Sequence, residues 1–280
     1  SSGPHSARVC VPALAPVRRP GDLSRVMPAT DFEAREASAA AAGAAGKRAY
    51  VQRMFSDIAP RYDLLNRVLS MGVDKYWRRV ALACLGWERV AGGLYLDLCA
   101  GTLDVAAALT ASRGFAGRVI GADFAEPMLR AGRGKVVEGR VTPVVADALS
   151  LPVRANSLDG AIVAFGIRNV ADLDACLCEV HRALVPGARF VILEFSTPRL
   201  ALARSAYHAY FHHVLPRIGG LVSGHRTAYT YLPESVRSFP ETSMLAERMR
   251  GAGFTDVQWQ SLTFGIAAVH VGTKTVDSGR

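Results

Sequence analysis

The sequence predicts an open α/β fold in which a mostly parallel sheet ends in an antiparallel hairpin. From Tyr50 onward, short apolar or β-branched runs alternate with stretches of helical periodicity, which is typical of parallel strands joined by right-handed crossovers. The last two runs, Thr255–Thr263 and Ile266–Lys274, are joined directly through Phe264 and Gly265, which indicates a hairpin.

The elements before the hairpin can be placed in chain order. Strands are predicted at Gly93–Leu98, Arg118–Ala122, Val141–Ala146, Leu158–Phe165 and Phe190–Phe195, each bounded by Gly, Pro or Asp. Helices are predicted at Thr102–Ser112, Pro127–Arg133 and Asp172–Leu184. The last of these carries its apolar residues at a period of 3.6, and we expect Val185-Pro186-Gly187 to end it.

Residues 1–46 differ in composition from the rest of the chain. They are rich in Ala, Ser, Pro and Arg and contain a single aromatic residue, Phe32, so they cannot bury enough surface to offset the entropy of ordering. We predict a disordered extension here and one domain over 47–280. A start at Met27, with residues 1–26 as an upstream extension, is the favoured interpretation, because no strongly amphipathic Arg-bearing helix runs through them; an organellar transit peptide, which their composition resembles, is the alternative.

Composition excludes several classes of protein. The chain of 280 residues holds 33 Lys and Arg against 24 Asp and Glu, a net charge of +9, but the basic residues are dispersed, which argues against a nucleic-acid-binding arm. The five Cys are odd in number and never spaced C-x-x-C, which indicates a reducing compartment and neither disulfides nor a thiolate metal site. No run approaches the ~18 apolar residues of a membrane span.

The residues after the first strand favour an adenosyl ligand without phosphates. Gly101 follows Asp97 at a predicted strand-to-helix turn, where a glycine allows the backbone to approach a ligand closely. A pyrophosphate site would need further glycines, whereas Leu103 and Val105 stand there, and Asp104 places negative charge at the helix start. Gly101 alone is equally compatible with an ordinary turn.

The next strand ends add to this signal. Asp123 follows the second strand, where a carboxylate can accept hydrogen bonds from a ribose diol, and Asp147 with Ala148 follows the third, beside an adenine edge. The fourth strand ends at Ala164 and Phe165. Suitable residues at four strand ends in order predict a site for one adenosine-shaped ligand.

Several motifs resemble those of one family. They are Met54-Phe55-Ser56-Asp57-Ile58-Ala59-Pro60-Arg61-Tyr62-Asp63, Asp97-Leu98-Cys99-Ala100-Gly101-Thr102, Phe165-Gly166-Ile167-Arg168-Asn169-Val170, Tyr231-Leu232-Pro233-Glu234-Ser235-Val236 and the terminal Leu262-Thr263-Phe264-Gly265-Ile266-Ala267. The sequence resembles the ubiquinone/menaquinone biosynthesis C-methyltransferases, within the class I S-adenosylmethionine-dependent enzymes. The resemblance implies a Rossmann-like seven-stranded sheet with helices on both faces and an N-terminal helical lid at about residues 47–90.

The resemblance also implies site residues. Its S-adenosylmethionine contacts fall on Asp97, Gly101, Thr102, Asp123, Asp147, Ala148 and Ala164, and the product would be S-adenosylhomocysteine. Relatives often have Gly at the position of Leu103 and Ser at that of Ala164, so contacts there are expected to differ. No metal is implied.

The implied reaction is methyl transfer to a ring carbon of a prenylated hydroquinone. Arg168 is the first candidate to hold a water or a developing phenolate, because a fixed cation stabilises negative charge that appears in the transition state. Tyr62 and Asp63 would complete the acceptor pocket. The alternative for Arg168 is a salt bridge to an Asp such as Asp147.

One further segment has two interpretations. Arg204–Val222 interleaves aromatic with basic residues, so it is either a helix packed on the domain or a cover for a prenyl tail that touches the membrane surface. His208 and His212 stand four residues apart, but no third ligand accompanies them.

The bacterial form of the glycine loop favours demethylmenaquinol as acceptor. The alternatives are a ubiquinone-pathway benzoquinol, a plastid phylloquinone precursor or another small molecule, and, in other classes, an NAD-linked oxidoreductase or an adenine-nucleotide- or RNA-binding domain. The partners expected are a lipid quinol and a peripheral membrane contact, without nucleic acid, and the resemblance favours a homodimer. The expected location is the cytoplasm at the inner face of the membrane, or an organelle if residues 1–26 are a transit peptide.

Overall fold

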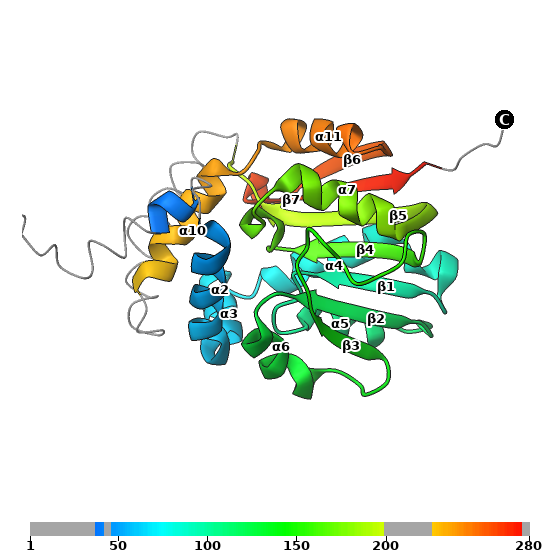
Figure 1. Ribbon diagram of the computed structural model, residues 1–280, viewed down its shortest axis with the longest axis horizontal. Coiled ribbons are helices and arrows are strands. Elements are labelled where there is room, and N and C mark those ends of the chain that lie inside the picture. The colour runs from blue at the N-terminus through cyan, green and yellow to red at the C-terminus, as the bar shows by residue number, and fades with distance from the viewer. Residues whose placement is uncertain (1–36, 42–45, 199–225, 276–280) are drawn as a thin grey trace, which may run out of the picture.

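All seven strands in the described part of the chain form one sheet. The computed structural model describes residues 37–41, 46–198 and 226–275. The strands are β1 (Leu94–Leu98), β2 (Arg118–Asp123), β3 (Val141–Val145), β4 (Leu158–Ala164), β5 (Leu184–Phe195), β6 (Phe254–Leu262) and β7 (Ala267–Lys274). Their order is β3-β2-β1-β4-β5-β7-β6 (Figure 1).

The predicted sheet and its terminal hairpin are confirmed. Strands β1 to β5 pair in parallel, and β7 is antiparallel to both β5 and β6. The strand order reverses between β1 and β4, because β2 and β3 continue to one side of β1 and β4 and β5 to the other. In an open α/β sheet, the carboxyl ends of the strands beside such a reversal form a natural ligand site.

Helices cover both faces and one end of the sheet. They are α2 (Lys47–Ile58), α3 (Tyr62–Leu69), α4 (Asp74–Leu85), α5 (Asp104–Thr110), α6 (Glu126–Gly132), α7 (Leu173–Ala183), α10 (Arg226–Ser238) and α11 (Thr242–Gly251), with short 3-10 turns that include η3 (Arg133–Lys135), η4 (Ile167–Asn169) and η6 (Thr263–Gly265).

The sheet separates two apolar cores. Along β4, Ile162 belongs to one core, whereas its neighbours Ala161 and Val163 belong to the other, as the two-residue period of a strand requires. Helices α4 and α5 close the first core, and α7 and α11 close the second. Each large side chain that is fully buried in this way contributes about 1.5–3 kcal/mol relative to an exposed position.

The end of α7 differs from the prediction. The helix is N-capped by Asp172, whose side chain accepts a hydrogen bond from the N–H of Ala175, and it ends at Ala183, before the Pro-Gly pair. Pro186 and Gly187 instead lie inside β5, which begins at Leu184, and the β4–β5 register shifts there. A Pro in a strand is tolerated at such an irregularity, so the pair disturbs the strand rather than ending the helix.

Helices α2, α3 and α10 stack at the carboxyl end of the parallel strands (left in Figure 1). Residues 37–41 are helical, and Ala37, Ala40 and Ala41 are buried in a cluster with Tyr50 of α2 and Tyr231 of α10. The rest of the predicted extension and the predicted Arg204–Val222 cover lie outside the described residues. Among the described helices, none has the length and apolar character needed to cross a membrane.

Candidate functional site

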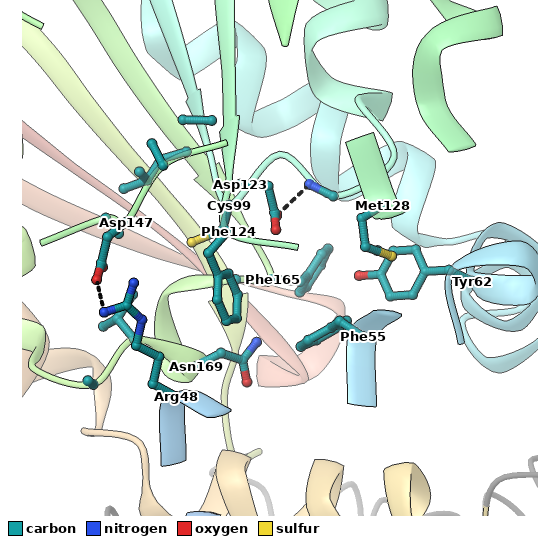
Figure 2. Close-up of a pocket in the computed structure, with 18 residues that line it drawn as sticks. Arg48, Phe55, Tyr62, Cys99, Asp123, Phe124, Met128, Asp147, Phe165 and Asn169 are labelled. Atoms are coloured by element: carbon teal, nitrogen blue, oxygen red, sulfur yellow. Dashed lines mark hydrogen bonds and ion pairs between the residues drawn. The ribbon is translucent and has the colours of Figure 1, made fainter. Parts of the chain in front are cut away.

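A cavity that is partly open to solvent lies where β1, β2, β3 and β4 end, and α2 and Tyr62 of α3 cover it (Figure 2). The residues that line it are Arg48, Phe55, Tyr62, Leu98, Cys99, Gly101, Ala122, Asp123, Phe124, Met128, Ala146, Asp147, Ala148, Phe165, Gly166, Asn169, Val170 and Ala171. Apart from one arginine, two aspartates, an asparagine, a tyrosine and a cysteine, these side chains are apolar. The cavity therefore suits a largely apolar ligand with a few polar groups.

The turn after β1 forms part of the cavity wall. Gly101 has a positive φ of 52°, and a Cβ there would lie 3.3 Å from Cε of Met128. Asp97 lies behind this turn, not in the wall, and accepts a hydrogen bond from the N–H of Ala106 at 2.9 Å, which fixes the start of α5. Burial raises the pKa of the Asp97 carboxyl to about 7. Asp97 thus stabilises the turn from behind the cavity wall.

Asp123 ends β2 and lines the cavity. Its Oδ2 accepts a hydrogen bond from the N–H of Gly101 at 2.8 Å (Figure 2), and its Oδ1 accepts one from the N–H of Ala125 at 2.8 Å. Burial raises the pKa of this carboxyl, and the backbone hydrogen bonds act in the opposite direction. A carboxylate has about four acceptor sites, so this one retains capacity for hydroxyl donors of a ligand.

Asp147 lies at the opposite side of the cavity, after β3. Its Oδ1 accepts a hydrogen bond from the N–H of Leu149 at 3.0 Å, and its Oδ2 lies 3.0 Å from Nη1 of Arg48 in α2. Ala148 lines the cavity beside it. The salt bridge that the sequence suggested between Asp147 and Arg168 is not formed, because Arg48 reaches Asp147 from the covering helix.

The two predicted lid residues have different positions. Tyr62 lines the cavity and packs edge-on against Phe55, with the ring centroids 5.9 Å apart, and burial raises its pKa. Asp63 lies outside the wall and accepts a hydrogen bond from Oγ1 of Thr102 at 2.5 Å. Thr102 likewise does not line the cavity. Thr102, which was predicted to contact the cofactor, and Asp63, which was predicted to contact the acceptor, are hydrogen-bonded to each other.

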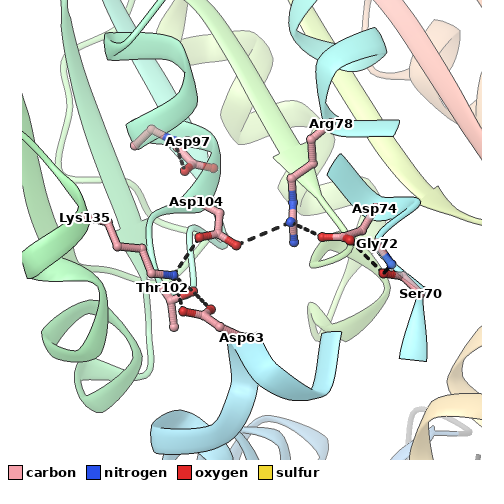
Figure 3. Close-up of polar contacts among 10 residues, drawn as sticks. Asp63, Ser70, Gly72, Asp74, Arg78, Asp97, Thr102, Asp104 and Lys135 are labelled. Carbon is pink, nitrogen blue, oxygen red and sulfur yellow. Dashed lines mark hydrogen bonds and ion pairs between the residues drawn. The ribbon is translucent and has the colours of Figure 1, made fainter. Parts of the chain in front are cut away.

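These two residues belong to a polar network that joins the N-terminal helices to the glycine turn (Figure 3). Lys135 of η3 forms ion pairs with Asp63 and with Asp104, the latter at 2.6 Å, and donates to Oγ1 of Thr102 at 2.9 Å. Arg78 of α4 then connects Asp104 to Asp74. We name Asp63, Thr102, Asp104, Lys135 and Arg78 the lid network.

Arg168 is not among the residues that line the cavity. Its Nη1 lies 2.8 Å from Oε1 of Glu194, at the end of β5, and donates to the carbonyl of Phe165 at 2.5 Å. Burial raises the pKa of the Glu194 carboxyl, and Arg168 opposes that rise. Arg168 is therefore placed to hold two strand ends together, and its predicted contact with the acceptor stays a prediction.

The predicted site residues thus fall into two groups. Those in the cavity wall are Gly101, Asp123, Asp147, Ala148 and Tyr62, and those outside it are Asp97, Thr102, Ala164, Asp63 and Arg168. Sequence reasoning missed the lining residues Arg48, Phe55, Phe124, Met128 and Asn169. The signal for Phe124 was its place directly after Asp123, and that for Phe55 was its place in the motif that ends in Tyr62 and Asp63, but nothing local marks Arg48. Among the described residues, no three His, Cys, Asp or Glu side chains are placed to hold a metal ion.

The strand order defines the ligand that the cavity can take. Asp147, Asp123 and Gly101 lie at the ends of three adjacent strands, β3, β2 and β1, so two carboxylates and an open backbone turn succeed one another across the sheet. The wall matches a nucleoside with an uncharged or positive substituent.

Comparison with known proteins gives one consistent family. The model of the ubiE/COQ5 methyltransferase family matches residues 44–274. A ubiquinone/menaquinone biosynthesis C-methyltransferase UbiE from Geobacter sulfurreducens is 46% identical over 80% of this chain and 88% of its own. A demethylmenaquinone methyltransferase from Thermus thermophilus is 48% identical over 79% of this chain and 100% of its own.

Solved structures of lower identity share the fold. A possible histamine N-methyltransferase from Thermotoga maritima, a S-adenosylmethionine-dependent methyltransferase, is 18% identical with a TM-score of 0.57, over 80% of this chain and 99% of its own. The [4+2]-cyclase SpnF is 18% identical with a TM-score of 0.60, over 82% and 97%. Because these two are named for different reactions, the likeness concerns the fold alone.

Proposed function

The chain belongs to the ubiE/COQ5 methyltransferase family, and we propose that it transfers a methyl group from S-adenosylmethionine to a ring carbon of a prenylated hydroquinone, with demethylmenaquinol as the acceptor. The observation that carries this proposal is the cavity at the ends of β1 to β4, whose lining residues all lie within the range that the family model matches. The names of the relatives supply the class of acceptor.

The residues of the cavity fit S-adenosylmethionine. Asp123 would accept hydrogen bonds from the ribose hydroxyls and Asp147 one from the adenine amine, because both carboxylates line the cavity with acceptor capacity to spare. The open turn at Gly101 would receive the methionine part. The rings of Phe55, Tyr62 and Phe165 face the same space and suit a cation, since aromatic faces attract positive charge.

The bound cofactor supplies an electrophilic methyl group: the acceptor's ring carbon forms the new bond to it, the electron pair of the broken sulfur–carbon bond stays on sulfur, and the ring releases one proton. The protein has to align the ring with that methyl group and exclude water. Phe55, Tyr62 and Phe165 provide apolar walls for this purpose. Burial keeps the Tyr62 hydroxyl protonated, so Tyr62 can act as a hydrogen-bond donor to the acceptor.

Calorimetric titration tests the cofactor assignment. We expect S-adenosylhomocysteine to bind and NADH not to bind. Asp123→Asn is expected to weaken the binding of S-adenosylhomocysteine about 10- to 100-fold, because the variant loses a charged hydrogen-bond acceptor. Asp159→Asn is the matched control, because Asp159 accepts a hydrogen bond from Leu94 at the start of β1, far from the cavity. Binding of NADH, or equal losses in both variants, would contradict the assignment.

An activity assay tests the acceptor. The protein is incubated with S-adenosylmethionine and either demethylmenaquinol or the corresponding benzoquinol, and the products are analysed by mass spectrometry. We expect ring methylation of demethylmenaquinol. Preferential methylation of the benzoquinol would mean that the proposed reaction is right but the proposed acceptor is wrong. The name of the Geobacter relative, which includes both ubiquinone and menaquinone, is compatible with either acceptor. Methylation of neither would overturn the proposed reaction.

We also propose a peripheral membrane contact, since the acceptor carries a prenyl tail. The net charge of +9 would favour an anionic surface, and Met71 and Phe264 are exposed apolar side chains that could enter it. Co-sedimentation with anionic vesicles that weakens with salt is the expected result, and equal binding at high salt would contradict the charge argument. The homodimer stays a prediction.

A further inference from the structure

Asn169 presents an amide nitrogen to the cavity. It ends η4, directly after β4, and is 7% exposed. Its Oδ1 accepts a hydrogen bond from the hydroxyl of Tyr231 at 3.0 Å, whereas its Nδ2 has no hydrogen-bond partner among the described residues. Figure 2 shows the nitrogen of this amide on the side of Phe124 and Phe165 and its oxygen turned away from them. The side chain is therefore fixed at one end and free at the end that faces the cavity.

Tyr231 fixes the amide from a different part of the chain. It lies in α10, is 1% exposed and packs against Tyr50 of α2, with the ring centroids 5.7 Å apart. Burial raises the pKa of its hydroxyl to about 12, so the hydroxyl keeps its proton and donates to Oδ1. An amide can flip between two orientations at little cost, unless a partner selects one of them. Tyr231 makes that selection.

The position of Asn169 in the sheet indicates which ligand it meets. The strand ends that fit the cofactor belong to β3, β2 and β1, and Asn169 follows β4, the next strand in the sheet. Asn169 therefore follows the strand on the side of β1 opposite to β2 and β3, and its amide nitrogen lies on the side of Phe165 (Figure 2). Phe55 and Phe165, which would flank a planar ring, line the same part of the cavity (Figure 2).

We propose that Asn169 Nδ2 donates a hydrogen bond to a ring oxygen of the acceptor hydroquinone, and that Tyr231 is the positioning residue that holds the amide in the donating orientation. This inference rests on the proposed function, of which it defines the acceptor end. A donor at the ring oxygen stabilises the phenolate that makes the ring carbon nucleophilic. The flipped amide would place its own oxygen against that phenolate and oppose its formation.

Kinetics of Tyr231→Phe test the positioning role. The variant removes only the hydroxyl, so we expect kcat to fall about tenfold, while the dissociation constant of S-adenosylhomocysteine stays within about twofold. Tyr95→Phe is the matched control: the Tyr95 hydroxyl is also buried and donates to the carbonyls of Trp87 and Val90, but it lies outside the cavity wall. The control is expected to lose stability and to keep kcat.

Two Asn169 variants test the donor itself. Asn169→Asp retains an oxygen for Tyr231 but presents an acceptor to the ring oxygen, so we expect the midpoint of the rise of kcat with pH to move up by about one unit. Asn169→Ala combined with Tyr231→Phe is expected to be no slower than Asn169→Ala alone, because both act through one hydrogen bond.

The outcomes separate the two claims. Three results would overturn the roles of Asn169 and Tyr231: additive losses in the double variant, an unchanged kcat in Tyr231→Phe, or a parallel loss of S-adenosylhomocysteine binding. In each case the wild-type protein would still be a methyltransferase. A wild-type protein that methylates no quinol would overturn the proposed function instead.

Discussion

Arg168 and Glu194 form an ion pair that is almost closed to solvent, with side chains 7% and 3% exposed. We expect Arg168→Ala to lower the free energy of unfolding by about 3–5 kcal/mol, because Glu194 would be left as a buried, unpaired charge. The double variant Arg168→Met with Glu194→Gln is expected to lose less. Urea unfolding measures both, and a double variant that loses as much stability as Arg168→Ala, or more, would contradict the pairing.

The ion pair of Arg168 with Glu194 also affects how the kinetics of an Arg168 variant are interpreted. If Arg168 touches the acceptor, as the sequence suggests, Arg168→Lys should lower kcat and leave S-adenosylhomocysteine binding unchanged. If it acts only by joining Phe165 to Glu194, turnover and cofactor affinity should fall together. Comparison of the two losses in this variant distinguishes the roles.

Asp97 predicts a pH dependence of stability. Its pKa is about 7 in the folded protein and near 3.8 in the unfolded chain, so the folded state holds a proton that the unfolded state releases between those values. Stability therefore falls as the pH rises from about 4 to 7, by about 2–4 kcal/mol for this group. Asp97→Asn should lack that decline. Parallel curves of unfolding free energy against pH for the two proteins would contradict the assignment.

At the scale of residues, the sequence predicts those site positions that follow directly from strand ends. Asp123 and Asp147 could be placed because a parallel strand delivers its next residue to a known edge of the sheet. The hydrogen bond between Thr102 and Asp63 could not be predicted, because it depends on how α3 docks. Arg48 pairs with Asp147 for the same tertiary reason.

The lid network connects α3 and α4 to the glycine turn. Lys135 bridges Asp63 and Asp104, so Lys135→Met should release α3 and weaken S-adenosylhomocysteine binding about three- to tenfold, with faster amide exchange over residues 62–85. The expected loss is moderate because the Lys135 side chain is 28% exposed. Lys75→Met removes the same charge from an exposed position on α4 and is expected to change neither quantity. Equal effects in both variants would indicate a general charge effect.

Elements could be predicted where periodicity is strong, as in the buried strands and α7. The start of β5 was predicted six residues late, because Pro186 and Gly187 are typical of an interruption and here lie inside the strand. The covering role of α2 agrees with the expected lid at about residues 47–90, but that of α10 was beyond sequence reasoning, since it depends on contacts such as that of Tyr50 with Tyr231, far apart in the chain.

At the scale of the molecule, the alternation of strands and helices was sufficient to predict the sheet, and the family motifs supplied its cofactor. The cavity between the sheet and its covering helices is where the predicted sheet and the predicted cofactor site coincide. Its walls combine carboxylates at the ends of β2 and β3 with aromatic rings from α2 and α3, so one ligand can be held by the sheet and a second enclosed by the helices.

The central claim is that this cavity delivers a methyl group to a quinol ring carbon. Its most direct test is mass spectrometry of the lipid quinones in a bacterial strain that lacks its own demethylmenaquinone methyltransferase and expresses this protein or its Asp123→Asn variant. We predict that the protein converts the accumulated demethylmenaquinone to menaquinone and that the variant does so poorly. Unchanged demethylmenaquinone in cells that contain the folded protein would contradict the account.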